Sequence, residues 1–197
     1  MNATKNPVVY EGMQTPWGKA DSATVYADGI GWVGTPSHGG CKLDRKRNAM
    51  IPSYMRQAGG WYEEDCDWCI PFVIFEAELK LCGDEFTQNT IKNGQHWHTF
   101  KNWHWKEYQT FTGTTIPEGE SSCKDRDLFM AGNRNNWVAV SAIGIDNGMV
   151  EVSATLGGIR ATGIEMRIFH VAEAEYDSRK FSYVIPEGMT PIKTRIW

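Results

Sequence analysis

The chain lacks any apolar run long enough to span a membrane. Its longest apolar stretch, residues 69–75, falls far short of the about 20 residues that a transmembrane helix needs, and it contains Pro71. The first seven residues hold no apolar segment of the kind found in secretory signals. The five cysteines form no regular disulfide framework, so we expect reduced, mostly buried thiols and a cytoplasmic location.

Motifs of several common enzyme and nucleic-acid-binding classes are also missing. The chain has no P-loop, no dinucleotide-binding glycine fingerprint, no G-x-S-x-G, no H-E-x-x-H and no internal repeat. Its net charge of −4 gives no general attraction to nucleic-acid phosphates. One local basic patch is formed by Lys42, Arg45, Lys46 and Arg47. These absences argue against the commonest hydrolases and leave no strong nucleic-acid signal.

What is present predicts a single α+β domain over residues 1–197. A loop- and helix-rich N-terminal lobe, about residues 1–115, is expected to pack on a C-terminal antiparallel β-meander, about residues 130–190, with one short helix. Alternating runs on either side of Asn147-Gly148 predict a hairpin with a type I′ turn. We expect a further strand at 164–171, a helix at 172–179 and a last strand at 181–185.

In the N-terminal half, helix-capping residues and the positions of glycine and proline predict the helices and loops. We expect a short helix at 52–57, a longer one at 63–81 and another at 103–111. Pro71 predicts a kink or break in the second of these, because proline has no amide proton to donate. Residues 89–95 and 119–127 are typical of loops.

Residues 61–68 are the most unusual segment, because four carboxylates lie within five positions between large aromatic rings. Like charges a turn apart repel one another, so stability alone would disperse them. On a helix, Glu63 and Asp67 would share one face, where carboxylates can bind a divalent cation or act as a base. An equal alternative is a helix N-terminus whose acidic residues cap amides. The segment comprises Trp61, Tyr62, Glu63, Glu64, Asp65, Cys66, Asp67 and Trp68.

Residues 35–40 offer a second candidate site. The glycines Gly39 and Gly40 would let the backbone approach an anion, Ser37 supplies a hydroxyl, and His38 can exchange protons near neutral pH. Two following basic residues, Lys42 and Arg45, could hold a phosphate or a carboxylate. A plain turn with a hydrogen-bonded histidine is the alternative, and it is slightly favoured because no phosphate-binding fingerprint is present.

Cysteine and histidine spacing gives a weaker signal for zinc. Cys66 and Cys69 form a C-x-x-C, and His96, His98 and His104 lie downstream. The histidine spacing is unusual and a second C-x-x-C is missing, so two buried cysteines are favoured over a metal site. The aromatic residues between 96 and 105 are expected mainly to pack. No cofactor is therefore predicted, although a divalent metal remains possible.

Three ordered motifs resemble an uncharacterised domain family of bacteriophage, plasmid and proteobacterial proteins. They are Thr15-Pro-Trp-Gly18, Thr35-Pro-Ser-His-Gly-Gly40 and residues 61–68. The resemblance extends to 102–104, 111–113 and 137–140, and covers most of residues 10–185. It implies no activity, but it does imply mobile-element biology, where small proteins often counter host defence. The expected location is then the cytoplasm of the host cell.

Three classes of function compete, and an enzyme is the less favoured outcome. The preferred reading is a binder of a nucleotide-like molecule or a host defence protein, with homo-oligomers possible. The alternatives are a phosphodiester or nucleotide hydrolase and a structural adaptor. A hydrolase would use His38, Glu63, Glu64 and Asp67. A binder would use Ser37, His38, Gly39, Gly40, Lys42, Arg45, Trp61, Tyr62 and Trp68. We also expect His38 and the acidic segment to face one cavity.

Overall fold

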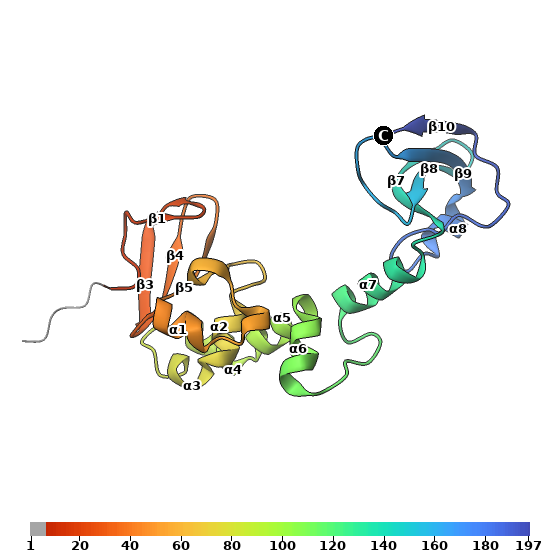
Figure 1. Ribbon diagram of the computed structural model, residues 1–197. Helices are drawn as coiled ribbons and strands as arrows, with labels where there is room; N and C mark the ends of the chain where they lie inside the picture. Colours follow the sequence, from red (N-terminus) through yellow and green to blue (C-terminus); the bar gives the residue numbers. More distant parts are fainter. Residues whose placement is uncertain (1–6) are drawn as a thin grey trace, which may run out of the picture. The chain divides into compact units, whose positions relative to one another are not determined.

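The computed structural model describes residues 7–197 and confirms the α+β class (Figure 1). The chain divides into two compact units, the first ending at Ser121 and the second running from Ser122 to Trp197. A single domain over the whole chain stays a prediction. Residues 1–6, which belong to the segment predicted not to be a secretory signal, lie outside the described part. Within 7–197, none of the helices has the length and apolar character that crossing a bilayer requires.

Unit 1 contains a four-stranded antiparallel sheet that the sequence reading missed. Its strands β3 (Ser22–Ala27), β4 (Ile30–Gly34), β5 (Gly39–Leu43) and β6 (Trp61–Glu63) pair in that order. A small hairpin of β1 (Gln14–Thr15) and β2 (Gly18–Lys19) precedes it. Glycines open and close several of these short strands, and glycine lowers the β-propensity on which prediction depends.

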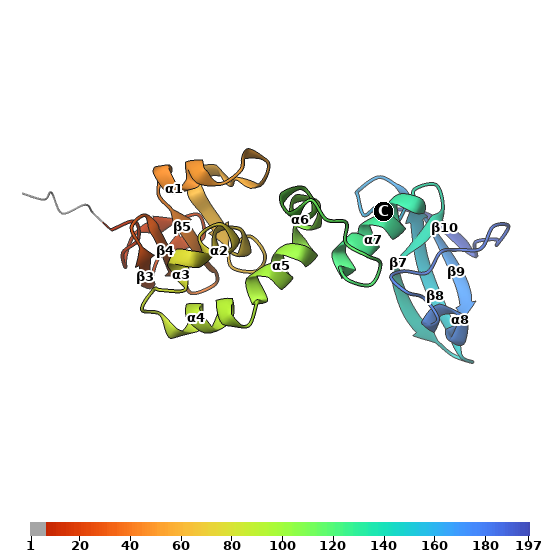
Figure 2. The ribbon, with the colours of Figure 1, turned by 90° about the horizontal axis from the view of Figure 1, so that it is seen from below.

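Six helices complete the described part of unit 1. Helix α1 (Arg45–Met50) begins after Asp44, whose carboxylate accepts the Arg47 amide at 2.7 Å. Next come α2 (Cys69–Ile74), α3 (Glu76–Leu79), α4 (Glu85–Lys92), α5 (Gln95–Trp103) and α6 (Trp105–Thr112). Helix α2 lies against α5, and α4 also contacts α5 (Figure 2). Their buried faces meet the sheet in a core that includes Ile30, Leu43, Tyr62, Ile70, Leu79 and Phe100.

The predicted helix at 63–81 is wrong in its first third. Glu63 closes strand β6, residues 64–68 form turns, and the helix begins only at Cys69. Glu63 and Asp67 therefore do not share a helical face. Pro71 sits in the first turn of α2, where amides have no helical partner and proline causes no break. The helix is interrupted instead at Phe75, whose backbone leaves helical geometry at φ −107° and ψ 21°.

Other boundaries in the first half also differ from the prediction. The loop expected at 89–95 lies largely within α4, and the loop at 119–127 overlaps helix α7 (Ser122–Gly132) of unit 2. The helix expected at 52–57 shrinks to a 3₁₀ turn, Ser53–Met55, and a second such turn spans Ala58–Gly60. Helix α6 confirms the predicted helix at 103–111, and Gly113 ends it in a left-handed conformation.

Unit 2 confirms the C-terminal meander. Strands β7 (Trp137–Ile145), β8 (Met149–Leu156) and β9 (Glu165–Ala172) are consecutive neighbours, and the short helix α8 (Glu173–Asp177) follows. Asn147 and Gly148 both have positive φ, at 63° and 66°, as the predicted type I′ turn requires. The last expected strand, 181–185, makes only one bridge to β7. The other edge of the sheet is taken by β10 (Lys193–Ile196).

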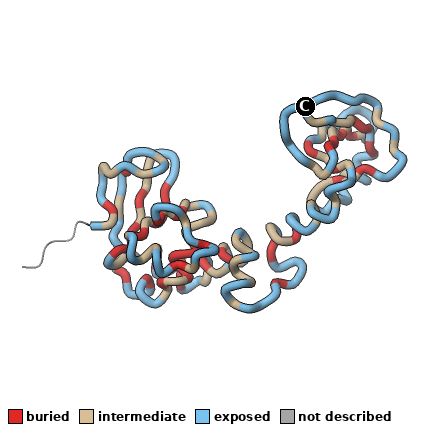
Figure 3. The backbone as a smooth tube through the Cα atoms, viewed as in Figure 1, coloured by how far each residue is buried: buried red, intermediate tan, exposed pale blue. Residues whose placement is uncertain are grey.

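The buried residues of each unit form cores of their own (Figure 3). In unit 2 the core lines one face of the meander, where alternate residues of β8 and β9 point inward. It includes Val150, Val152, Phe169, Val171, Tyr183 and Ile185. Since each unit buries its own apolar face, we describe the functional sites unit by unit.

Candidate functional site

The four clustered carboxylates lie in a turn between β6 and α2, which we call the acidic turn (residues 63–68). The Asp65 amide donates to Glu63 Oε2 at 2.7 Å, and the Trp68 amide donates to the Glu63 carbonyl at 2.9 Å. The Glu64 amide donates to the Gly39 carbonyl at 3.1 Å, which ties the turn to β5. Backbone hydrogen bonds thus hold the charged side chains at fixed positions despite their mutual repulsion.

His38 reaches the acidic turn from the loop between β4 and β5. Its Nδ1 lies 3.9 Å from Glu63 Oε1 and 3.8 Å from Glu64 Oε1. Thr35 fixes the loop, because its hydroxyl donates to the His38 carbonyl at 2.7 Å and accepts the His38 amide at 3.1 Å. The Glu63 Oε1 atom is buried without a hydrogen-bond partner among the described residues. The structure therefore brings together the histidine and the carboxylates that sequence reasoning had paired.

A second histidine reaches the other end of the acidic turn. His104, which follows α5, places its Nε2 3.3 Å from Asp67 Oδ1 and 3.2 Å from the Cys66 carbonyl oxygen. Burial opposes the charged imidazole, but the Asp67 carboxylate, the Cys66 carbonyl and Glu107 outweigh it and raise the pKa of His104. This contact joins residues 37 positions apart, so no local spacing signals it.

Cys66 lies beside this pair but does not have the properties of a nucleophile. Burial and the neighbouring carboxylates, Asp67 first among them, raise the pKa of the Cys66 thiol to about 11. The thiol faces Asp67 Oδ1 at 3.8 Å. A protonated thiol beside a carboxylate has little reactivity, so the Cys66, Asp67 and His104 cluster does not support covalent catalysis.

The contact between His104 and Asp67 predicts that the stability of the protein depends on pH. Since folding raises the pKa of His104, its stabilising contribution is complete below the ordinary histidine value of about 6.5 and is lost as pH rises through the folded value. We expect His104→Gln to reduce the fall in unfolding free energy between about pH 6 and about pH 8. Denaturant unfolding at the two pH values measures it. Replacing the exposed His98 with Gln is the control, and an unchanged slope in His104→Gln would contradict the assignment.

The residues that could hold a metal are grouped differently from the prediction. Two sets each place three ligand atoms within 4.8 Å of one another: His38 with Glu63 and Glu64, and Cys66 with Asp67 and His104. The predicted set of Cys66, Cys69, His96 and His98 is not assembled. The Cys69 thiol donates to the Cys66 carbonyl at 3.0 Å, His96 is buried 3.4 Å from Glu76, and His98 is exposed.

Gly39 and Gly40, which were predicted to let the backbone approach an anion, lie in a closely packed part of the sheet. Both lie within β5 and are buried. A Cβ at position 39 would lie 2.7 Å from Glu64 Oε2, and one at position 40 would lie 2.4 Å from the Tyr62 carbonyl oxygen. Glycine is required at both positions because neighbouring atoms occupy the space that a Cβ would take.

The predicted phosphate-binding cations do not face His38. Lys42 Nζ lies 4.4 Å from the Trp61 ring centroid and donates to the Gly59 carbonyl, while burial lowers the pKa of Lys42. Arg45 opens α1, beyond the opposite end of β5 from His38. Ser37 is exposed in the loop that holds His38. Neither Lys42 nor Arg45 is therefore positioned to bind an anion at the acidic turn.

Of the predicted aromatic ligand contacts, Trp68 lines a pocket of unit 1 that is described below. Tyr62 is fully buried, and its hydroxyl donates to Asn48 Oδ1 at 2.7 Å, so it is a core residue. Trp61 packs edge-on against Trp17 with 5.7 Å between the ring centroids, and Lys42 covers part of the Trp61 ring. Their rings are already occupied by neighbours within the fold.

A pocket of about 420 Å³ opens beside the acidic turn, between strands β3 and β4 and helices α2 and α4. We call it the aromatic pocket. Its volume lies within the range of small-molecule sites. Apart from the acidic turn, sequence reasoning missed it, although Thr24 and Tyr26 stand two apart on one strand and so share a face. Its lining is Thr24, Tyr26, Trp32, Glu64, Trp68, Phe72, Asp84, Phe86, Thr90 and Gln95.

The rings of the aromatic pocket have a box-like arrangement. Phe72 is buried, and three rings stand nearly perpendicular to its plane, at 87°, 78° and 90°. These rings belong to Tyr26, Trp32 and Trp68. A fifth ring, Phe86, is 77% exposed near the start of α4. All five rings line the cavity, so a flat ligand that enters it would contact several aromatic side chains.

The charge of the aromatic pocket is negative. Its ionisable lining consists of the two carboxylates, Glu64 and Asp84, and of Tyr26. Burial raises the pKa of Tyr26, so its hydroxyl stays protonated at neutral pH. Asp84 also caps α4, with its Oδ2 accepting the Thr87 amide at 2.8 Å. Among the described lining residues there is no lysine, arginine or histidine.

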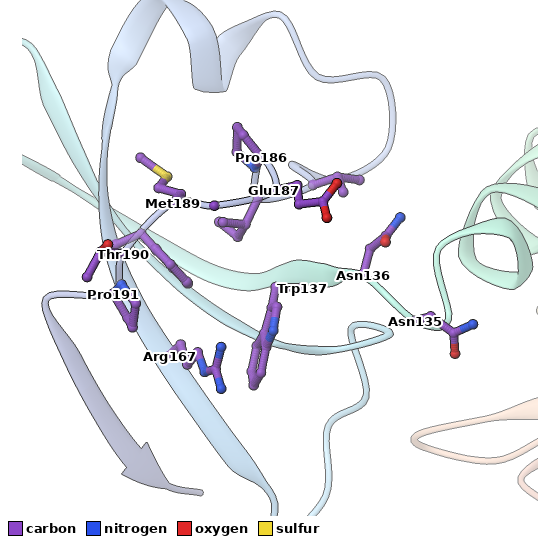
Figure 4. A pocket seen from close by; sticks show the side chains of 13 residues that line it. Asn135, Asn136, Trp137, Arg167, Pro186, Glu187, Met189, Thr190 and Pro191 are labelled. Carbon is purple, nitrogen blue, oxygen red and sulfur yellow. The ribbon is translucent and has the colours of Figure 1, made fainter.

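Unit 2 has a larger pocket, of about 770 Å³, under the loop formed by residues 186–191 (Figure 4). The Arg167 guanidinium carbon lies 4.0 Å from the Trp137 ring centroid, and its Nε donates to Glu165 Oε1 at 2.7 Å. Asn135, Asn136 and Glu187 contribute polar groups. None of the residues predicted to form a catalytic, ligand-binding or metal site lines this pocket.

Comparison with known proteins identifies one family. Residues 10–134 match the family described as Domain of unknown function (DUF7007). No curated protein matches, and no solved structure matches. The matched region holds both histidine contacts and the whole aromatic pocket, whereas the lining of the unit 2 pocket begins at Asn135.

Proposed function

Because the chain belongs to this family of unknown function, we propose a role from the geometry of unit 1: it binds and sequesters a small ligand with a flat ring. The aromatic pocket is the observation that carries the proposal. In the nucleotide-like class, the base would enter the box and stack on its rings. Its amino groups could donate to Glu64, while any phosphate would remain outside, away from the carboxylates.

This role fits a protein that removes a molecule rather than converting it. A mobile element would counter a host defence in the cytoplasm by sequestering the nucleotide-like signal on which that defence depends. The five free thiols agree with a reducing compartment. The predicted alternative target, a host protein, would instead require an extended surface around the pocket.

Hydrolysis is the second candidate, favoured by the contact of His38 with two carboxylates. The pair could position a proton acceptor beside a water molecule. Against it, Lys42 is engaged by Trp61, and Arg45 lies at the other end of β5, so the leaving phosphate has no arranged cation. A product that forms with the natural chain and disappears in His38→Ala would establish hydrolysis in place of binding.

The exposed ring Phe86 provides the test of ring binding. We expect Phe86→Ala to weaken retention of a ring ligand about 5- to 150-fold, since a stacked base is worth about 1–3 kcal/mol. Its 77% exposure means that the fold should survive the change. Native mass spectrometry of the purified chain, followed by heat release and equilibrium titration of the released molecule, measures the effect.

A matched control comes from another exposed ring in the same unit. Trp103 is 57% exposed at the end of α5 and does not line the pocket, so Trp103→Ala should retain the ligand fully. Equal loss of ligand from both variants would indicate that the ligand binds nonspecifically to exposed aromatic rings. Full retention by Phe86→Ala would place the ligand elsewhere.

A further inference from the structure

We propose that the aromatic pocket of unit 1 selects ligands whose ring carries a positive charge, such as an N-alkylated or protonated nitrogen heterocycle. The inference rests on the proposed function, since it assumes that the pocket holds a ring, and it adds the charge of that ring. It follows from two independent features of the lining, the arrangement of the rings and the sign of the fixed charges.

The first feature is the number of ring faces and edges around one small volume. An aromatic face carries partial negative charge and attracts a cation within about 6 Å of its centroid, most strongly when the cation is desolvated. Tyr26, Trp32 and Trp68 pack against Phe72, at centroid distances of 6.1, 6.5 and 5.0 Å, and all four line the cavity. A ring cation inside the cavity would therefore lie close to several aromatic rings.

The second feature is the presence of two carboxylates with no cation beside them in the described lining. Glu64 Oε1 lies 3.8 Å from His38 Nδ1, and that histidine does not line the pocket. Asp84 Oδ2 accepts the Thr87 amide at 2.8 Å, and this single neutral donor compensates its charge only in part. Any ligand that enters is surrounded by negative charge, which favours a cation and disfavours a phosphate.

Three positive side chains of the described part of unit 1 are engaged by other groups. Lys80 pairs with Glu76, Arg47 pairs with Glu78 at 2.7 Å, and Lys42 lies over Trp61. The charge that the pocket lacks is therefore not supplied by these neighbouring side chains. A cationic ring would bring a positive charge into the pocket. It would be attracted both by the aromatic rings and by the carboxylates of Glu64 and Asp84.

Two probes of equal shape isolate the charge. The cation is 1-methylnicotinamide, and its neutral counterpart is 3-methylbenzamide, in which carbon replaces the positive nitrogen. We expect the cation to bind the full chain at least about 10-fold more tightly, because a desolvated cation over aromatic faces is strongly favoured. Isothermal titration and Trp fluorescence report the binding, because two of the nine tryptophans, Trp32 and Trp68, line the pocket.

Charge-removing variants then locate the effect. Glu64→Gln keeps the shape of the side chain, and Asp84→Asn keeps a good helix cap, so both should fold. Each should reduce the preference for the cation about 3-fold or more while leaving 3-methylbenzamide unchanged. Asp65→Asn removes the same charge from an exposed neighbour that does not line the pocket, and should leave the preference intact.

The outcomes separate this inference from the function on which it rests. Equal binding of the two probes would overturn charge selection and leave the ring-binding role standing. Binding of neither probe, together with no effect of Phe86→Ala on a retained ligand, would overturn both. Tighter binding of adenosine 5′-monophosphate than of 1-methylnicotinamide would overturn charge selection in favour of an anionic ligand.

Discussion

Replacing Phe100 with alanine is expected to lower the free energy of unfolding by about 3–5 kcal/mol, the range for truncating a buried phenylalanine. The ring is fully buried in α5 and contacts four other rings, the His104 imidazole among them. Its centroid lies 6.2 Å from that of Trp97, 5.8 Å from that of Tyr108 and 6.2 Å from that of Phe111. Truncation leaves a cavity that these large rings cannot easily close.

Denaturant unfolding of the full chain, followed by the amide signals of unit 1, measures this loss. Phe86→Ala is the matched control, because the same ring is removed from a site that is 77% exposed. It should change stability by no more than about 0.5 kcal/mol. A loss below about 1 kcal/mol in Phe100→Ala would mean that α5 does not anchor the core as described.

Gly40→Ala is expected to cost about 1–3 kcal/mol through overpacking. The new Cβ would lie 2.4 Å from the Tyr62 carbonyl oxygen and 2.6 Å from the Trp17 ring. The carbonyl belongs to β6, which pairs with β5, so it cannot move without disturbing the sheet. The acidic turn begins where β6 ends, and its geometry should change with the strand.

Gly83→Ala is the control, since a Cβ there meets no atom within 4 Å and the backbone has no positive φ. Thermal and denaturant unfolding of both variants should show a loss only for Gly40→Ala. If the two variants have equal stability, the close packing of β5 against β6 is refuted. The prediction that Gly39 and Gly40 let the backbone approach an anion would then be favoured.

The C-terminal meander could be predicted because its signals are local. Asn147 and Gly148 adopt the positive φ that their dipeptide indicates, and the flanking alternation sets the inward face of each strand. The same local rules failed in unit 1. Its strands are short and glycine-rich, and the carboxylates of residues 63–67 imitate a helix start although Glu63 belongs to a strand.

Sequence alone therefore determined the α+β class and the hairpin at Asn147-Gly148, and it singled out residues 61–68 as a candidate site. It also paired His38 with Glu63 by chemical type. Only the tertiary structure decided that His104 meets Asp67 and that the rings of β3, β4, α2 and α4 enclose a negative pocket. The physical reason is range: turn geometry depends on adjacent residues, whereas a pocket depends on how separate segments pack.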